Sequence, residues 1–264
     1  TLFSSKGEGM NTVRSVKSLH IGKLRHQLRQ LGKRLQREYV MPVIAIDGPA
    51  ASGKGIIAEM LAREMRWSYL DSGVLYRAVA YVAQERGITL QQTEALIHLA
   101  GNPPFILCKQ APWVPPYVFF EGRDISQSVR TEEIASYASE IATISGVREV
   151  LMPIMLDEQK SSGLIADGRD MGTVVFPEAA LKFFTISQPE VRAQRRFQQE
   201  AECGGKVSLS STLQAIQVRD KRDQMRAIAP LQPALDSMVI DTTKLTVLEV
   251  FQCVVNKAVE RAEY

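Results

Sequence analysis

A glycine-rich segment that ends in a lysine carries the clearest chemistry in this sequence. The segment consists of Gly48, Pro49, Ala50, Ala51, Ser52, Gly53 and Lys54. It matches the G-x-x-x-x-G-K pattern of a phosphate-binding loop, in which glycines let the backbone curl until several N–H groups point inward. These donors and the Lys54 ammonium group form a cradle for the polyphosphate of a nucleotide. The alternative is an ordinary glycine-rich turn with a chance lysine.

The residues after the lysine depart from the common form of this loop. A Ser or Thr hydroxyl usually follows the lysine and helps to hold a magnesium ion, but this chain has Gly55 and then Ile56. Because the cradle is made of backbone, we expect the loop to fold. We also expect Mg²⁺ to be placed less firmly, without a direct metal ligand from the side chains, since Ile56 replaces the usual hydroxyl.

The loop needs a frame of strands and helices, and the apolar pattern predicts one. A short β-branched run at 43–46 precedes the loop, and helical periodicity from Ile56 to Met65 follows it. Further parallel strands are predicted at 164–166, 181–186 and 238–240, with a closing helix at about 246–262. This alternation indicates an α/β fold with a doubly wound parallel sheet flanked by helices. A strand before the loop and a helix after it favour the phosphate-binding interpretation.

Two segments differ from this alternation. Five prolines between Gly87 and Gly122 exclude a continuous helix there, and the apolar run that ends this stretch indicates a small inserted module with short β elements. We place the insert at about 87–148. After Pro189 we expect a charged helix, and a solvated helix face is the ordinary interpretation of its arginines.

Residues 1–41 are strongly basic. They carry nine Lys or Arg and two Glu, a net charge of +7 in a chain whose total is +3. Apolar Leu24, Leu28, Leu31 and Leu35 recur at helical spacing, so we expect a basic helical N-terminal extension over residues 16–39. It would pack on the body or fray in solvent, and the alternatives are an organellar transit peptide, a nucleic-acid contact or a fusion linker.

The bulk composition favours a cytoplasmic enzyme. No run approaches the roughly 18 apolar residues of a membrane-spanning helix, and the N-terminal residues lack the apolar stretch that a secretory signal would have. The three cysteines, Cys108, Cys203 and Cys253, form no CxxC pair. We therefore expect a reducing compartment and no membrane contact, with an organellar location as the alternative if residues 1–41 are a transit segment.

Several motifs occur in one order along the chain. They are Asp71-Ser72-Gly73 with Tyr76 and Arg77, then Asp167-Gly168-Arg169-Asp170-Met171-Gly172-Thr173, and then Arg219, Asp223 and Arg226 followed by Ala229-Pro230-Leu231. Together with the phosphate loop, this order resembles the cytidylate kinases, the bacterial-type CMP/dCMP kinases among the nucleoside monophosphate kinases. The resemblance spans residues 42–264. It implies a P-loop NTPase-type sheet with a small NMP-binding insert and a helical lid.

The resemblance also implies an activity and an acceptor site. The protein would use ATP with Mg²⁺ to phosphorylate CMP and dCMP to CDP and dCDP in pyrimidine nucleotide metabolism. Phosphate contacts would come from Arg77, Arg169 and Arg226, because a guanidinium group can bind phosphate through two parallel hydrogen bonds. Cytosine contacts would come from Ser139, Arg148 and Asp170, and ribose contacts from Tyr76, Arg219 and Asp223, with Ser72 at the start of the site.

For the donor side, the resemblance implies a mobile lid at about 188–206 that closes over ATP, with Gly204 and Gly205 as its flexible return. Residues 48–56, Arg192 and Arg195 would bind ATP. Lys54, Arg169, Arg192 and Arg196 would stabilise the charge that develops during transfer. The acceptor is already a phosphate oxyanion, so no general base is required.

Other functions stay open on sequence grounds. The acceptor could be another small molecule, Ile56 could mark a nucleotide-binding protein without turnover, and the basic extension could bind nucleic acid. We expect ATP and CMP or dCMP as partners, a monomer, and no nucleic acid. The sequence leaves the CMP to dCMP preference and the role of residues 1–41 open.

Overall fold

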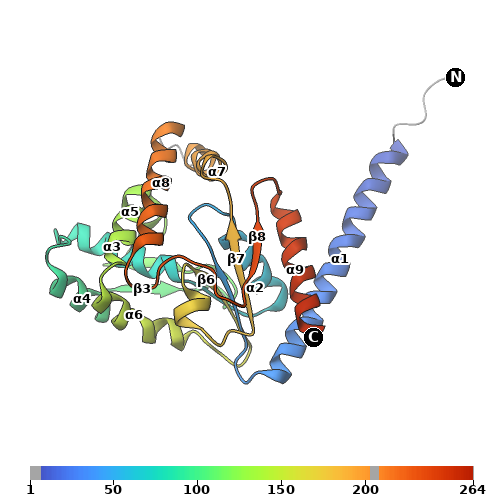
Figure 1. The fold of residues 1–264 in the computed structure, drawn as a ribbon, viewed down its shortest axis with the longest axis horizontal. Coiled ribbons are helices and arrows are strands. Elements are labelled where there is room, and N and C mark those ends of the chain that lie inside the picture. The colour runs from blue at the N-terminus through green and yellow to red at the C-terminus, as the bar shows by residue number, and fades with distance from the viewer. Residues whose placement is uncertain (1–6, 203–207, 264) are drawn as a thin grey trace.

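The computed structural model describes residues 7–202 and 208–263, with side chains at 22–201 and 208–262. Its centre is a five-stranded parallel sheet in the order β2-β6-β1-β7-β8 (Figure 1). The strands are β1 (Val43–Asp47), β2 (Ser68–Asp71), β6 (Leu164–Gly168), β7 (Leu181–Ile186) and β8 (Met238–Asp241). The expected fold class is confirmed, and so are four of these strands. β2 was not predicted.

The strands are buried on both faces, as their continuous apolar character predicts. All five residues of β1 and of β6 are buried. Successive side chains of β1 point to opposite faces, so Val43 and Ala45 belong to one core while Ile44 and Ile46 belong to the other. The sheet therefore separates two hydrophobic cores.

Helices cover the two faces. One core is formed against α1 (Gly7–Glu38), α2 (Lys54–Met65) and α9 (Val247–Glu263). The other is formed against α3 (Ser72–Glu85), α4 (Thr93–Gly101), α5 (Glu132–Ile141) and α6 (Ser145–Asp157). The helix predicted after the phosphate loop is α2, and the predicted closing helix is α9.

The register of the strands brings the motifs to one edge of the sheet. Asp47 at the end of β1 pairs with Gly168 of β6, and Asp71 at the end of β2 pairs with Asp167. In parallel α/β sheets, ligands bind beyond this carboxyl edge. The phosphate loop and the Asp71 segment therefore meet the Asp167 segment, although it follows them by about 100 residues in sequence.

The insert combines a small sheet with helices. Strands β3 (Phe105–Cys108), β4 (Tyr117–Phe120) and β5 (Arg123–Asp124) form an antiparallel sheet, which agrees with the expected short β elements. The helix α4 was not expected there. It ends before Pro103, so the prolines do not interrupt it. A short turn η1 (Ser128–Arg130) leads into α5.

The charged helix expected after Pro189 is α7 (Pro189–Glu202), and it packs against α8 (Leu209–Met225). Both lie on the same side of the sheet as α5, above the carboxyl edge of the strands (Figure 1). Gly204 and Gly205, the expected flexible return, lie outside the described residues.

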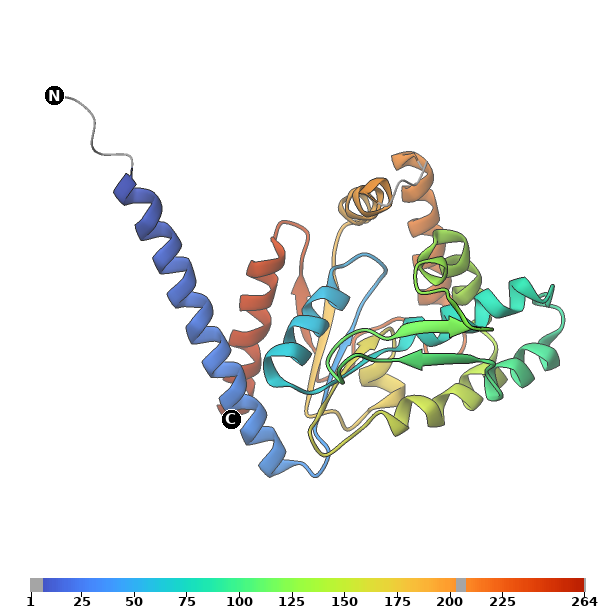
Figure 2. The same cartoon turned by 180° about the vertical axis from the view of Figure 1, so that it is seen from behind.

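The C-terminal part of the helix α1 packs beside α9 and α2, whereas its N-terminal part extends away from the body (Figure 2). Leu24, Leu28, Leu31 and Leu35 are all buried. Arg25 forms an ion pair of 2.8 Å with Glu64 of α2. The part of the extension that carries these leucines therefore packs on the body. No helix among the described residues is both long and apolar enough to span a membrane.

Candidate active site

A cavity of about 1230 Å³ opens at the carboxyl edge of the sheet. The phosphate loop and the start of α2 line one side of it, and α3, α5 and η1 of the insert line another. α7 and α8 close it from above. Nine cationic and seven acidic side chains line its wall. A positively charged cleft of this kind attracts anionic ligands.

The phosphate loop is fixed by hydroxyl groups of neighbouring strands. Gly48 has a φ of 150°, and a Cβ there would lie 2.2 Å from Thr185 Oγ1, so only glycine fits. Ser52 Oγ lies 2.8 Å from Thr185 Oγ1, and Thr242 Oγ1 donates to Ser52 O at 2.9 Å. The Ser52 hydroxyl is therefore held by the sheet, while the loop itself lines the cavity.

Lys54 is the first residue of α2 and its side chain is buried. Its Nζ lies 3.8 Å from Asp167 Oδ1 and 3.4 Å from Pro49 O. Burial, followed by the charge of Arg169, lowers the pKa of Lys54 to about 8, and burial raises the pKa of Asp167 above its usual range. A ligand phosphate would favour the charged ammonium form. The nearest carboxylate oxygen is thus too far from the ammonium group for a hydrogen bond, and a ligand phosphate could bind the ammonium group more closely.

Ile56 forms part of the cavity wall and is 44% exposed. Among the described residues, no group of three His, Cys, Asp or Glu side chains is arranged to hold a metal ion. Asp167 Oδ1 is buried and has no hydrogen-bond partner in the described structure. It is a carboxylate oxygen of the type that Mg²⁺ prefers.

Asp47, the last residue of β1, was missed by the sequence analysis. Its two carboxylate oxygens accept from Met171 N and Gly172 N, each at 2.8 Å. Burial raises its pKa to about 7, although the two N–H donors act in the opposite direction. Asp47 thus holds the turn η2 (Met171–Val175), directly after Arg169 and Asp170. The sequence signal was a carboxylate at the end of a buried strand.

One group of predicted site residues gathers around Asp170. Its carboxylate pairs with Arg148, and Arg226 Nη2 lies 3.7 Å from Asp170 Oδ1. The Arg148 guanidinium carbon lies 5.9 Å from the centre of the Tyr76 ring. Tyr76, assigned to the ribose by resemblance, therefore lies with the residues assigned to the base. Its hydroxyl group is buried without a partner in the described structure.

A second group gathers around Asp223 of α8. Ser139 Oγ donates to Asp223 Oδ1 at 2.8 Å, and Arg169 Nε donates to Oδ2 at 3.2 Å. Arg219 Nε lies 4.0 Å from the same oxygen. Burial raises the pKa of Asp223, but the charges of Arg169 and Arg219 outweigh this and hold it below its usual value. Ser139 thus contacts the residue assigned to the ribose rather than Asp170.

The Asp71 segment supplies the third group. Asp71 caps α3 by accepting from Val74 N at 3.1 Å, and Arg77 Nη2 lies 3.1 Å from Asp71 Oδ2. Ser72 Oγ donates to Asp167 O at 2.8 Å. Arg77 and Asp71 both line the cavity, so the Asp71 carboxylate holds the Arg77 guanidinium group in place at the wall.

The three arginines of α7 lie in different surroundings. Arg192 is 2% exposed, forms an ion pair with Asp220 and donates to Ala50 O at 3.2 Å, so it supports the phosphate loop from behind and is absent from the cavity wall. Arg195 donates to Thr242 O at 2.6 Å. Arg196 reaches the insert, where it donates to Arg130 O at 2.7 Å. Arg195 and Arg196 line the cavity.

Comparison with known proteins decides the family. The model of the family described as cytidylate kinase matches residues 44–260. The chain belongs to the cytidylate kinase family. The cytidylate kinase of Pseudomonas putida is 44% identical over 220 residues, which cover 83% of this chain and 96% of that protein. The cytidylate kinase of Pseudomonas entomophila is 46% identical over 211 residues, which cover 80% and 92%.

The match to the cytidylate kinase family confirms the resemblance inferred from the motifs. It includes the phosphate loop, the insert, α7 and α8. The helix α1 lies outside the residues that the family model matches. The cavity is therefore built entirely from the part of the chain that cytidylate kinases share.

Proposed function

We propose that this protein transfers the γ-phosphoryl group of ATP to CMP or dCMP. Membership of the cytidylate kinase family carries the reaction class. The observation that supports it within the structure is one cavity that holds the phosphate loop with Lys54 together with three arginine–carboxylate groups. Such transfer needs two anionic nucleotides held in line, with cations placed where charge develops.

In this proposal, the loop and Lys54 bind the donor. The backbone N–H groups of residues 48–54 accept the polyphosphate, and Lys54 stabilises charge between the β and γ phosphates. Arg195 and Arg196 contact the donor from α7. Arg192, which is buried against Asp220, would act by fixing Ala50 rather than by touching ATP.

The acceptor would lie among the three arginine groups. Arg77, Arg169 and Arg226 bind its phosphate, and each has a carboxylate neighbour that holds the guanidinium group in position. Asp170, fixed by Arg148, accepts from the cytosine amine. Uracil has a carbonyl at that position, which cannot donate to the carboxylate and places two acceptor oxygens opposite each other, so UMP is disfavoured.

The residues present fit a magnesium ion that arrives with ATP. Mg²⁺ keeps several waters and needs only one or two carboxylates from a protein in such sites. Asp167 offers a buried oxygen that accepts no hydrogen bond in the described structure, with the Lys54 ammonium group 3.8 Å away. When bound, the ion would neutralise charge on the β and γ phosphates. Ile56 offers no oxygen toward it.

A release assay for ADP tests the proposal. ATP and Mg²⁺ are supplied with CMP, dCMP, UMP or AMP in turn, and turnover on CMP and dCMP should be well ahead of the other two. Asp170→Asn should narrow the gap between CMP and UMP, because the amide can donate to the uracil carbonyl. AMP as the best acceptor would refute the assignment of the acceptor.

Ile56 favours a second candidate, a nucleotide-binding protein without turnover. The loss of the loop hydroxyl affects catalysis more than binding, because the cradle is backbone. The same assay separates the two: binding of ATP and CMP without release of ADP would support the second candidate.

A further inference from the structure

Arg196 joins α7 to the insert at the wall of the cavity. Its Nη2 donates to the backbone oxygen of Arg130 at 2.7 Å. Its Nε lies 3.4 Å from Glu132 Oε2 and 2.8 Å from Glu200 Oε1. Glu200 belongs to the same helix as Arg196, whereas Glu132 is the first residue of α5. The contact with Glu132 therefore connects two separate parts of the chain.

Arg196 differs from the other arginines of α7 in what holds it. Arg192 is buried against Asp220 and backbone oxygens, and Arg195 is bound by the backbone of Thr242. Those partners lie within the framework of the sheet and α8. Arg196 and Glu132 both line the cavity, with side chains 22% and 27% exposed. A ligand in the cavity can therefore reach this pair.

Glu132 lies at the N-terminal end of α5, next to the cavity. An acidic residue in the first turn of a helix is stabilised by the helix dipole, and Glu132 occupies that place in α5. Its charge acts on Arg219 as well, where it partly opposes the lowering of the pKa by burial and by Arg169. Glu132 thus contacts Arg196 and also acts electrostatically on a second cation of the cavity.

We propose that Glu132 is an internal counter-ion that occupies Arg196 in the nucleotide-free protein and competes with the triphosphate of ATP for it. The inference rests on the proposed function, because it takes ATP as the ligand beside α7. Carboxylate and phosphate are both acceptors that a guanidinium group binds through paired hydrogen bonds. Binding of ATP therefore has to replace the Glu132 contact, and this weakens the measured affinity.

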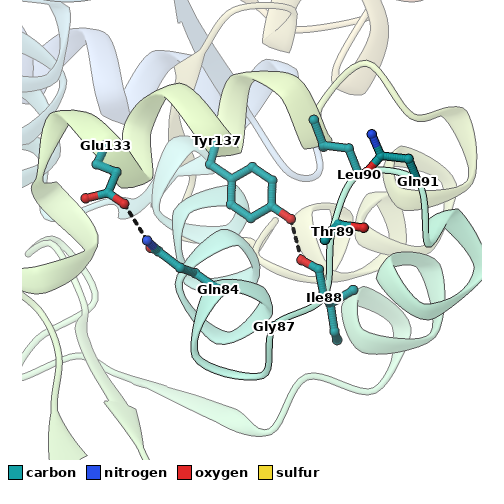
Figure 3. Close-up of a pocket in the computed structure, with 8 residues that line it drawn as sticks. All are labelled: Gln84, Gly87, Ile88, Thr89, Leu90, Gln91, Glu133 and Tyr137. Atoms are coloured by element: carbon teal, nitrogen blue, oxygen red, sulfur yellow. Dashed lines mark hydrogen bonds between the residues drawn. The ribbon is translucent and has the colours of Figure 1, made fainter.

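The neighbouring residue provides a matched control. Glu133 has the same charge, lies one position further along α5 and also borders the main cavity. Its carboxylate, however, pairs with Gln84 at a second pocket of about 420 Å³ and not with Arg196. Figure 3 shows Glu133 pointing toward Gln84 there, on the side where Tyr137 donates to Ile88 O at 2.6 Å. If negative charge on α5 had a general effect, both glutamates would show it. Only Glu132 pairs with Arg196, so only its removal should end a competition for that arginine.

The test measures the affinity of the full chain for AMP-PNP with Mg²⁺ by titration calorimetry. Glu132→Gln should bind about two- to fivefold more tightly than the wild type, which is the scale of a partly exposed ion pair. Glu133→Gln should bind like the wild type. In steady-state kinetics Glu132→Gln should lower the KM for ATP by a similar factor and leave kcat within twofold.

The same substitution in Arg196→Gln protein shows whether the tighter binding of AMP-PNP depends on Arg196. In Arg196→Gln protein, the further change Glu132→Gln should no longer tighten binding. Unchanged or weaker binding in Glu132→Gln, equal tightening in Glu133→Gln, or tightening that persists without Arg196 would overturn the inference. A wild type that does not bind AMP-PNP would instead refute the proposed function, so the two failures are distinguishable.

Discussion

The burial of Lys54 disfavours its charged form in the folded protein but strengthens the interaction of that charge with a ligand phosphate. Lys54 is buried beside Asp167, and burial together with the charge of Arg169 lowers its pKa to about 8. A desolvated cation interacts more strongly with a ligand phosphate than one in water does. The same burial makes the folded state sensitive to pH, because the unfolded chain restores the pKa to its usual value.

Replacing Lys54 by Met should separate these two effects. Turnover should fall by about a hundredfold or more, on the scale of losing one preorganised electrostatic contact. Between pH 8 and 10.5 the unfolded chain binds the proton of Lys54 more tightly than the folded chain, so this residue makes stability rise with pH. Urea unfolding at pH 7.5 and 9.5 should show that the wild type gains stability relative to Lys54→Met.

The control for this experiment is Lys160→Met, because Lys160 has a half-exposed side chain far from the loop in sequence. It should change neither turnover nor the pH dependence of stability. Turnover close to that of the wild type in folded Lys54→Met would contradict the role of the phosphate loop.

With Ile56, the enzyme should have a lower kcat with magnesium-ATP and need more Mg²⁺ than it would with threonine at this position. The Ile56 side chain is 44% exposed in the cavity wall, so a change there leaves the core intact. Ile56→Thr supplies a hydroxyl, which should raise kcat by about ten- to a hundredfold, the equivalent of about 1.5 to 3 kcal/mol for a hydrogen bond to a charged centre. The Mg²⁺ concentration for half-maximal rate, measured at saturating ATP and CMP, should fall.

Ile56→Val is the matched control, because valine has the shape of threonine without its hydroxyl. It should behave like the wild type. An equal response of Val and Thr would show that side-chain size matters here, and no response in either would show that the loop positions its metal without a hydroxyl.

At the scale of elements, the phosphate loop and the acceptor segment are joined through Asp47. This residue ends β1, so it is continuous with the loop, and its carboxylate holds the backbone of Met171 and Gly172. Arg169 and Asp170 directly precede that backbone. The donor and acceptor sides thus share one rigid link between β1 and η2.

The elements also show what could be predicted from sequence. Apolar runs predicted β1, β6, β7 and β8, because buried parallel strands are apolar along their whole length. β2 was missed, since its four residues include Ser68 and Asp71. The partners of Asp223 could not be predicted: Ser139 lies 84 positions away and meets it only through the packing of α5 against α8.

Asp47→Asn should weaken the acceptor side more than the donor side. An amide can accept from only one of the two N–H groups and turns its own N–H₂ toward the other. The lost bond should cost about 1 to 3 kcal/mol of stability and let η2 shift with Arg169 and Asp170. The KM for CMP should therefore rise more than the KM for ATP.

The control is Asp157→Asn, whose side chain is 89% exposed at the end of α6. Both KM values should stay at the wild-type level. Equal increases in the two KM values for Asp47→Asn would mean that the carboxylate supports the whole sheet edge rather than the acceptor segment.

At the scale of the whole molecule, α1 is an addition to a domain that carries the whole cavity. The family model matches residues 44–260, and the described residues that line the cavity begin at Ala50. Yet α1 contributes four buried leucines to the core that it shares with α2 and α9. At Gly32, a Cβ would lie 3.5 Å from Nε1 of Trp67, so the two segments approach closely there. The helix therefore contributes to the packing of the folded chain, and none of its described residues lines the cavity.

Removal of residues 1–41 should therefore leave catalysis intact and reduce stability. A single substitution tests this without deleting the helix: Leu28 is fully buried, and Leu28→Ala should lower the free energy of unfolding by about 2 to 5 kcal/mol. Turnover on CMP per folded molecule should stay at the wild-type value, because Leu28 packs on the face of the sheet that carries α2 and α9. Gln30→Ala, at an exposed position of the same helix, should change neither quantity.

The measurements are urea unfolding and initial rates at a temperature where each variant is folded. A stable Leu28→Ala would mean that α1 contributes little to the core, whereas a folded truncation with greatly reduced turnover would mean that α1 helps to hold α2 and the phosphate loop in place.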